Sequence, residues 1–92
     1  MIQTFKHEGL KEFFETGAAR GIPTSRAPRI QQLLDTLDQA KDLRDVNLPG
    51  FSFHALKGDR KGEFAIKVTG NYRLTFKFQN GHAREVDLED YH

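Results

Sequence analysis

Two histidines, an arginine and the last residues of this sequence are suited to acid–base chemistry on a phosphodiester. His54 and Arg73 lie in the second half of the chain, which ends Asp90-Tyr91-His92. Histidine can accept or donate a proton because its unperturbed pKa of about 6.5 lies near neutral pH. Arginine can hold a phosphate because its planar guanidinium donates parallel hydrogen bonds and stays charged. RNA cleavage without a metal needs only a base for the 2′-OH, an acid for the departing 5′ oxygen and a fixed cation.

The division of roles among these side chains stays open at this stage. His54, Asp90 and His92 can each carry a proton, and Asp90 can instead orient a histidine. Tyr91 is suited to stack on a nucleobase, and Lys57 is a further cation for phosphate. The structural alternative is that His54 is a satisfied strand residue and that the terminal residues are frayed polar ones.

Other kinds of catalytic chemistry find little support. The absence of cysteine excludes disulfides, thiolate zinc sites and cysteine nucleophiles. The four histidines show no spacing of three or four residues, and neither serine, Ser25 or Ser52, has the context of a nucleophile. Segment 57–62 resembles a phosphate-binding loop but lacks the helix whose N-terminus would receive the anion. We therefore expect neither a metal ion nor a cofactor.

The net charge of +1 hides a segregation along the chain. The first 46 residues are neutral, residues 47–84 carry seven basic and two acidic side chains, and the last eight residues carry four acidic ones. The middle segment, at +5, interleaves its cations with aromatic residues, a pattern typical of surfaces that bind RNA. Lys57, Lys67 and Lys77 are the RNA-binding candidates. Alternatively, the aromatic residues form the core and the cations are their solvated neighbours.

Hydrophobic periodicity predicts two helices in the first half of the chain. Leu10, Phe13 and Phe14 recur at helical spacing and predict a helix that ends near Gly17. The same spacing predicts a second helix over residues 27–40, with a proline in its first turn. Each helix has one apolar face.

A period of two replaces the helical period after Gly50. It predicts strands over residues 51–56, 63–68, 71–78 and 82–88, with a short edge strand at residues 2–5. The connections are too short for parallel crossovers, so neighbouring strands must be antiparallel. The predicted fold class is α+β, with two helices packed on one face of a twisted antiparallel sheet.

The alternation also assigns side chains to the two faces of this sheet. The apolar residues of segment 71–78 must meet the helices, so Arg73 and Lys77 belong to the open face. The preceding strand places Lys67 there by the same reasoning, and His54 is a candidate for that face. The proposed basic surface therefore comes together on the open side of the sheet.

The chain length limits what kind of site is possible. With 92 residues and 10.5 kDa, we expect a single domain over residues 1–92. A domain of this size has no room for a deep cleft between lobes, so an active site must be shallow. No segment resembles a signal peptide or approaches the ~18 apolar residues of a membrane span. We therefore expect a cytoplasmic protein without a membrane partner.

Several blocks of sequence together match one known family. They are Ile2-Gln3-Thr4-Phe5, Gly9-Leu10, Phe13-Phe14-Glu15-Thr16-Gly17, His54-Ala55-Leu56-Lys57-Gly58-Asp59-Arg60-Lys61-Gly62, Asn71-Tyr72-Arg73-Leu74-Thr75-Phe76 and Asp90-Tyr91-His92. With these blocks the chain resembles the HigB branch of the RelE/ParE toxin superfamily over essentially its whole length. The two long blocks and the ending are specific in combination.

The resemblance implies a RelE-like microbial RNase fold whose concave sheet face is the active site. It implies a ribosome-dependent endonuclease that enters the A site and cuts translated mRNA. A HigA-type antitoxin with a helix-turn-helix domain would neutralise it, and DNA would be contacted only through the antitoxin complex. By the family's pattern, Arg73 holds the scissile phosphate, while His54, Asp90 and His92 share the proton transfers. The pattern further implies that Tyr91 positions the RNA and that Lys57 contacts phosphate.

Two alternatives and one departure accompany this interpretation. A ParE-like toxin would inhibit gyrase by protein binding without cutting RNA, although such members generally lack this set of histidines and tyrosine. A non-catalytic RNA- or ribosome-binding domain is the other alternative. The departure is Tyr72, where many relatives have tryptophan; it faces away from Arg73, so we expect an adjustment of packing. The acidic residues of the helical layer are either an antitoxin docking surface or a solvated helix face.

Overall fold

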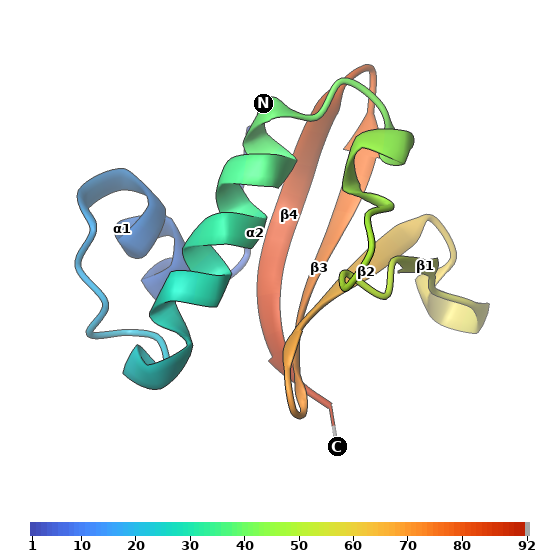
Figure 1. The fold of residues 1–92 in the computed structure, drawn as a ribbon. Helices are drawn as coiled ribbons and strands as arrows, with labels where there is room; N and C mark the ends of the chain where they lie inside the picture. Colours follow the sequence, from blue (N-terminus) through green and yellow to red (C-terminus); the bar gives the residue numbers. More distant parts are fainter. Residues whose placement is uncertain (92) are drawn as a thin grey trace.

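The computed structural model of this chain contains a four-stranded antiparallel sheet that is covered on one face by helices (Figure 1). The structure describes residues 1–91. The strands follow one another in the order β1 (His54–Ala55), β2 (Glu63–Thr69), β3 (Tyr72–Gln79) and β4 (His82–Asp90). The predicted α+β architecture is confirmed, and β2, β3 and β4 coincide with predicted strands to within two residues.

The helical layer consists of α1 (Glu8–Thr16) and α2 (Ala27–Gln39), with 3-10 turns η1 (Thr24–Arg26), η2 (Leu43–Val46) and η3 (Gly58–Arg60) along the chain. Helix α1 is capped at its N-terminus by His7, whose Nδ1 accepts a hydrogen bond from the Leu10 N–H at 2.9 Å. It ends at Gly17, which adopts the left-handed conformation with φ 83° and donates its N–H to the Phe13 carbonyl. Both helices match the sequence prediction.

The core lies between the helices and the sheet. The helices contribute Leu10, Phe13, Ile30, Leu33, Leu34 and Leu37, all buried. The sheet contributes Ile66, Val68, Leu74 and Phe76, also buried, and Tyr72 packs against this core as predicted. The side chains of Arg73 and Lys77 alternate with these apolar residues and therefore lie on the opposite face. No helix of residues 1–91 is long and apolar enough to cross a bilayer.

The N-terminal segment runs beside β4, parallel to it. The expected edge strand at residues 2–5 is reduced to two isolated bridges, Ile2 to Ala83 and Phe5 to Val86. The Ile2 N–H donates to Asp38 Oδ1 at 2.8 Å, which ties this segment to α2. Asp38 therefore has a structural role, which weakens the interpretation of the helical acids as a docking surface.

The predicted strand over residues 51–56 is wrong for most of its length, because only His54 and Ala55 pair with β2. Phe51 is buried, and its carbonyl accepts a hydrogen bond from the Lys67 N–H at 2.7 Å. Ser52 then turns the chain with a φ of 49°, a conformation that interrupts any strand. The burial of one aromatic ring thus takes precedence over the alternating pattern of the segment.

Arg29 connects the helical layer to the sheet and to the segment that leads into β1. Its Nε donates to the Val68 carbonyl at 3.0 Å, and its Nη2 donates to the carbonyls of Gly50 at 2.8 Å and Lys67 at 3.0 Å. The guanidinium also lies 5.1 Å from the centre of the Phe51 ring. Three carbonyls at the end of β2 and before β1 depend on this one side chain.

We predict that Arg29→Ala lowers the free energy of unfolding by about 2–3 kcal/mol, because it removes the charged donor of three carbonyls, of which that of Val68 is partly buried. Arg20→Ala is the matched control, since Arg20 makes an exposed ion pair with Glu12, and we expect a change within about 0.5 kcal/mol. Urea unfolding followed by circular dichroism measures both values. Equal effects of the two substitutions would contradict the connecting role of Arg29.

Candidate active site

Three rows of side chains cross the open face of the sheet, because residues paired directly across antiparallel strands share a face. The strand register gives the rows Lys67-Arg73-Glu89, His54-Ala65-Thr75-Asp87 and Glu63-Lys77-Arg84. His54 and Arg73 therefore lie on one face, in neighbouring rows and on strands separated by β2. With strands about 4.8 Å apart, roughly 10 Å of sheet separates their backbones. Ala65 and Thr75, which lie in the second row of this face, are buried.

Arg73 lies on β3 between Lys67 and Glu89 and has two fixed neighbours. Its Nε and Nη2 donate to Glu89 Oε1 at 3.1 and 2.9 Å. Its guanidinium carbon lies 4.5 Å from the centre of the Tyr91 ring, a cation–π contact. Among residues 1–91, Nη1 has no hydrogen-bond or ion-pair partner. The side chain thus presents one unoccupied pair of N–H donors, which suits an anion.

Glu89 is a central residue of this face that the sequence analysis missed. Its carboxylate accepts from Arg60 Nη1 at 2.9 Å and Nη2 at 2.5 Å, from Arg73, and from Thr75 Oγ1 at 3.0 Å. The hydrogen bonds from Arg60, with smaller contributions from Arg73 and Thr75, lower the pKa of Glu89 to about 2. Glu89 is therefore ionised at neutral pH.

Arg60 extends this network across the face. It comes from η3 and pairs with Glu63 Oε1 at 2.8 Å as well as with Glu89. Hydrogen bonds to Glu89 and then to Glu63 raise the pKa of Arg60 above its ordinary value. Thr75, which lies between these carboxylates in the register, is 1% exposed. We call Arg60, Glu63, Arg73 and Glu89 the Arg–Glu network; it attaches the β1–β2 loop to β3 and β4.

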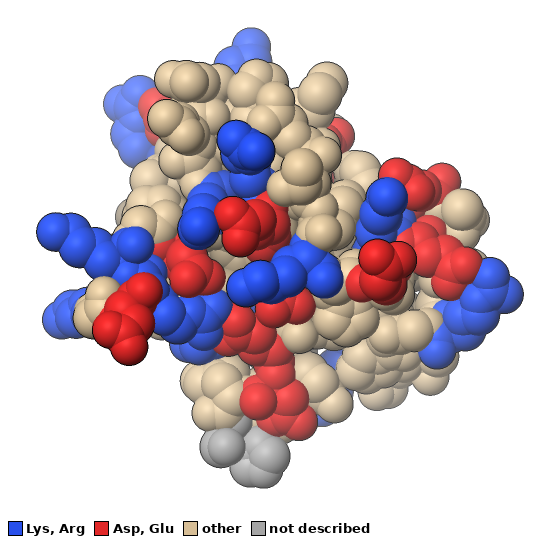
Figure 2. Space-filling view, turned by 180° about the vertical axis from the view of Figure 1, so that it is seen from behind, with Lys and Arg blue, Asp and Glu red and all other residues tan. Residues whose placement is uncertain are grey.

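The open face is mixed in charge, which corrects the expectation of a +5 basic surface. Figure 2 shows acidic and basic side chains interleaved on the face opposite the view of Figure 1. The acidic end of the chain forms β4 and therefore brings its carboxylates to the basic strands. Lys77 Nζ pairs with Glu85 Oε2 at 3.1 Å, while Lys67 and Lys57 are exposed.

His54 is exposed at the edge of this face, and its ring is oriented by one hydrogen bond. Its Nδ1 lies 2.9 Å from the Ser52 carbonyl oxygen. Because a carbonyl oxygen can only accept, this bond requires the proton on Nδ1, and the neutral ring then carries its lone pair on Nε2. Nε2 is thus the nitrogen that can take a proton from a substrate.

A β-bulge determines which carboxylate of β4 lies opposite Arg73. The pairing shifts by one residue between Thr75 and Lys77, next to Glu85, which has a φ of 52°. Without this shift Leu88 would face Arg73 and Asp90 would share its side of the sheet. With it, Glu89 faces Arg73, while Asp90 pairs with Tyr72 and lies on the other side by alternation.

The chain end is held against Asn71, at the start of β3. The Tyr91 N–H donates to the Asn71 carbonyl at 2.9 Å, and Asp90 Oδ1 accepts a hydrogen bond from Asn71 Nδ2. The structure therefore brings Tyr91 to Arg73 but does not bring Asp90 to it. His92 lies outside the described residues.

A sequence signal for the bulge exists. The buried residues of β4, Ala83 and Val86, are three apart, whereas Val86 and the half-buried Leu88 are two apart. A change of spacing within one strand indicates an extra residue. This pattern could have identified Glu89 as the neighbour of Arg73; nothing comparable marks Arg60.

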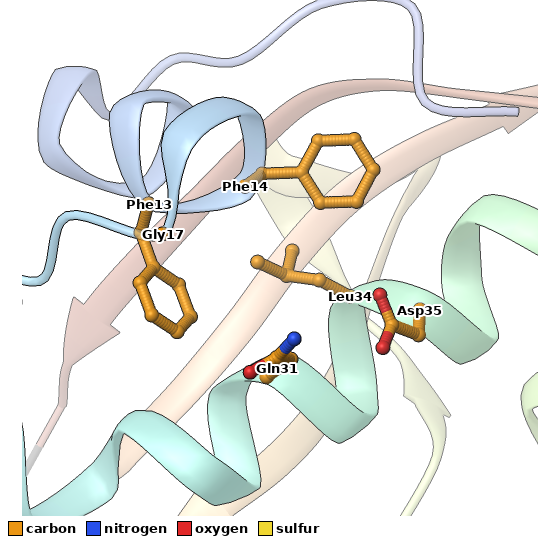
Figure 3. A pocket seen from close by; sticks show the side chains of 6 residues that line it. All are labelled: Phe13, Phe14, Gly17, Gln31, Leu34 and Asp35. Atoms are coloured by element: carbon orange, nitrogen blue, oxygen red, sulfur yellow. The ribbon is translucent and has the colours of Figure 1, made fainter.

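A surface pocket lies between the two helices rather than on the open face (Figure 3). Phe13 and Phe14 of α1 and Gln31, Leu34 and Asp35 of α2 line it, together with Gly17. None of the candidate residues contributes to it. Within residues 1–91, no group of three or more His, Cys, Asp or Glu side chains is arranged to hold a metal ion.

The lowered pKa of Glu89 predicts a pH-dependent contribution to stability. A carboxylate whose pKa falls from 4.5 to about 2 on folding stabilises the protein above pH 4.5 and loses this effect as the pH falls toward 2. Glu89→Gln removes this contribution. We expect the variant to be less stable at pH 7 by about 1–2 kcal/mol, a value reduced for solvent screening, and the difference to close by about pH 2. Thermal unfolding between pH 7 and 2 measures it; parallel curves would contradict the assignment.

Comparison with known proteins agrees with the resemblance seen in the sequence. A family model described as "RelE-like toxin of type II toxin-antitoxin system HigB" matches residues 3–92. "Endoribonuclease HigB" of Proteus vulgaris is 44% identical over 92 residues, covering 100% of both chains. "Toxin HigB-1" of Vibrio cholerae is 34% identical over 91 residues, covering 97% of this chain and 96% of that one.

The fold has a counterpart among solved structures. A chain of the "YoeB-YefM complex from Staphylococcus aureus" superposes with a TM-score of 0.65 and 19% identity, covering 100% of this chain and 95% of that one. At this identity the likeness concerns the fold alone. The family model and the two full-length relatives carry the assignment. The chain belongs to the HigB-like family of RelE-like toxins of type II toxin–antitoxin systems.

Proposed function

We propose that this toxin is a ribosome-dependent endoribonuclease that cleaves translated mRNA in the A site and thereby stops translation. Endoribonuclease activity follows from family membership and from 44% identity over the full length to a relative of that name. The observation that carries the proposal is Arg73, which lies on the open face beside Tyr91 and whose Nη1 has no partner among residues 1–91. This is the arrangement expected for a scissile phosphate with a nucleobase next to it.

The reaction is a transfer of the phosphodiester to the neighbouring 2′ oxygen. A base removes the 2′-OH proton, the 2′ oxygen forms a bond to phosphorus, and the bond from phosphorus to the 5′ oxygen breaks. An acid gives a proton to the departing 5′ oxygen, which leaves a 2′,3′-cyclic phosphate and a new 5′-OH end. Arg73 stabilises the negative charge that accumulates on the phosphoryl oxygens.

His54 is the best oriented candidate for the base, because its hydrogen bond to Ser52 leaves Nε2 to accept the proton. We propose that Asp90 and His92 share the remaining proton transfers from the chain end. Asp90 fits least well, since the bulge turns its register position away from Arg73. Tyr91 stacks on a base next to the cleaved bond.

Lys57, Lys67 and Lys77 are proposed to contact the RNA backbone. Lys67 on β2 pairs with Arg73 on β3 in the strand register. Lys57 lies just before η3, in the β1–β2 loop that Arg60 attaches to the sheet. All three are exposed. Lys77 is already paired with Glu85, so binding of Lys77 to RNA would require that ion pair to break, which reduces its net contribution to affinity.

The shape of the open face supports dependence on the ribosome. His54, Arg73, Lys67 and Lys77 lie on one face of the sheet, and none of them lines the pocket between the helices. Such a surface can fix few bonds of a flexible RNA by itself, and holding a reacting phosphodiester in line contributes several kcal/mol to catalysis. Messenger RNA in the A site is already held by the ribosome, so the toxin needs to supply only its chemical groups.

An antitoxin is the partner implied by a type II toxin–antitoxin family. We propose that it is of HigA type with a helix-turn-helix domain, and that the toxin contacts DNA only through this complex. The ribosomal target implies a cytoplasmic site of action. A gyrase-inhibiting activity of ParE type remains the alternative function, but the name of the 44% identical relative favours RNA cleavage.

Primer extension on a message translated in a reconstituted system tests the function. We expect new 5′ ends with the wild type, none on the same RNA without ribosomes, and a loss of about a hundredfold or more with Arg73→Ala, because the cation that stabilises the transition state is gone. Arg44→Ala is the control with unchanged cleavage, because Arg44 is exposed and pairs with Asp42 away from the open face. Intact mRNA together with trapped gyrase–DNA complexes would establish the alternative.

A comparison of two substitutions tests the role of Tyr91. Tyr91→Phe keeps the ring over Arg73 and should retain cleavage to within about threefold, whereas Tyr91→Ala should lose about tenfold or more, since stacking on a base contributes about 1–3 kcal/mol. Single-turnover cleavage of ribosome-bound mRNA provides both rates. A large loss with Tyr91→Phe would assign the function to the hydroxyl group instead of the ring.

A further inference from the structure

We propose that Glu89 is a positioning residue, held by Arg60, that fixes the guanidinium of Arg73 for the substrate and at the same time limits the affinity of the open face for RNA. The inference rests on the proposed function of Arg73. It assigns a role to two residues outside the set of His54, Arg73 and the chain end. It also predicts opposite effects on binding and on rate, which a purely structural role does not.

The carboxylate of Glu89 is fixed from several sides. Oε1 accepts from Arg73 Nε at 3.1 Å and Nη2 at 2.9 Å and from Arg60 Nη1 at 2.9 Å. Oε2 accepts from Arg60 Nη2 at 2.5 Å and from Thr75 Oγ1 at 3.0 Å. These donors come from β3 and η3, and the Glu89 side chain is 19% exposed. Rotation of the carboxylate would break bonds to two elements at once.

Arg73 is in turn oriented by Glu89. Two hydrogen bonds to Oε1 fix the Nε and Nη2 edge of its guanidinium, and the Tyr91 ring covers one face. The remaining group is Nη1, the one proposed to meet the phosphate. Without Glu89 the long arginine side chain regains rotamers, and a catalytic group displaced by about 1 Å can cost about a hundredfold in rate.

Glu89 does not itself qualify as the base of the reaction. Its pKa of about 2 means that it holds no proton at neutral pH and accepts one poorly. Both oxygens are occupied by donors. Its contribution must therefore act through Arg73.

The Arg–Glu network is also balanced in charge, with two guanidinium groups and two carboxylates. An incoming phosphate approaches an arginine whose charge is already partly compensated by Glu89. Removal of that negative charge makes the face more attractive to RNA, most strongly at low ionic strength. Binding should therefore improve in the same variant in which the reaction slows.

Glu89→Gln, compared with Glu12→Gln, is the central experiment. Single-turnover cleavage of mRNA bound to purified ribosomes is measured against toxin concentration at low salt. For Glu89→Gln we expect the saturating rate to fall about tenfold or more and the half-saturating concentration to fall about threefold. Glu12→Gln removes a carboxylate of α1 that pairs with Arg20, in the helical layer, and should change neither value.

Arg60→Gln separates positioning from charge. It removes the other support of Glu89, so the saturating rate should again fall about tenfold, but the lost cation should raise the half-saturating concentration. The inference is supported if both variants, Glu89→Gln and Arg60→Gln, lose saturating rate while the first binds more tightly and the second more weakly. A wild-type saturating rate in Glu89→Gln overturns it, and so does a loss of rate without tighter binding.

Two further measurements keep the test decisive. If Glu89→Gln does not fold, Thr75→Val removes only one hydrogen bond to Oε2 and should lower the saturating rate about threefold, while an unchanged rate overturns the inference. Hydrogen exchange at the Arg73 Nε–H, followed by NMR, should become faster in Glu89→Gln than in Glu12→Gln. This readout needs no cleavage, so a wild type without activity refutes the proposed function while the exchange rates still decide the positioning role.

Discussion

The ionised carboxylate of Glu89, enclosed by two arginines and a threonine, is the interaction on which the open face depends. Arg60 approaches it from the β1–β2 loop, and Arg73 and Thr75 approach it from β3. Removal of the carboxylate leaves the two guanidinium groups without that partner in a partly buried site, and removal of the guanidinium groups leaves the carboxylate without its charged partners. Either change is costly in free energy. Glu89 therefore contacts both the loop that carries Lys57 and the arginine proposed to bind phosphate.

The sheet makes this arrangement possible by dividing its faces between two tasks. The helices cover the side formed by Leu74 and Phe76, and the opposite side remains open to carry charged groups. Alternating side chains can pack against the helices on one face and carry charged groups on the other only if the strand register stays fixed, because a shift of one residue exchanges the two faces. The bulge beside Glu85 adjusts that register, so that Val86 and Leu88 meet the core while Glu89 meets Arg73.

Periodicity predicted both helices and three of the four strands, because each carries a repeating apolar face. It also placed Arg73 on the open face and Tyr72 on the core. The strand at 51–56 failed because burial of Phe51 and the positive φ of Ser52 are tertiary effects. Asp90 was expected to carry a proton or to orient a histidine, but the bulge turns its register position away from Arg73. Partners on different strands, such as Arg60 and Glu89, depend on a register that no local pattern contains.

The balance of charge on the open face bears on how such a toxin would select its target. An unopposed cluster of cations binds any RNA through counterion release, without regard to sequence or context. Here Glu63, Glu85 and Glu89 compensate the cations around them, and the chain as a whole carries only +1. Under the proposed function, free RNA would gain little from this face. Messenger RNA already held by the ribosome loses less entropy on docking, so it is the substrate for which a small number of well-oriented groups suffices.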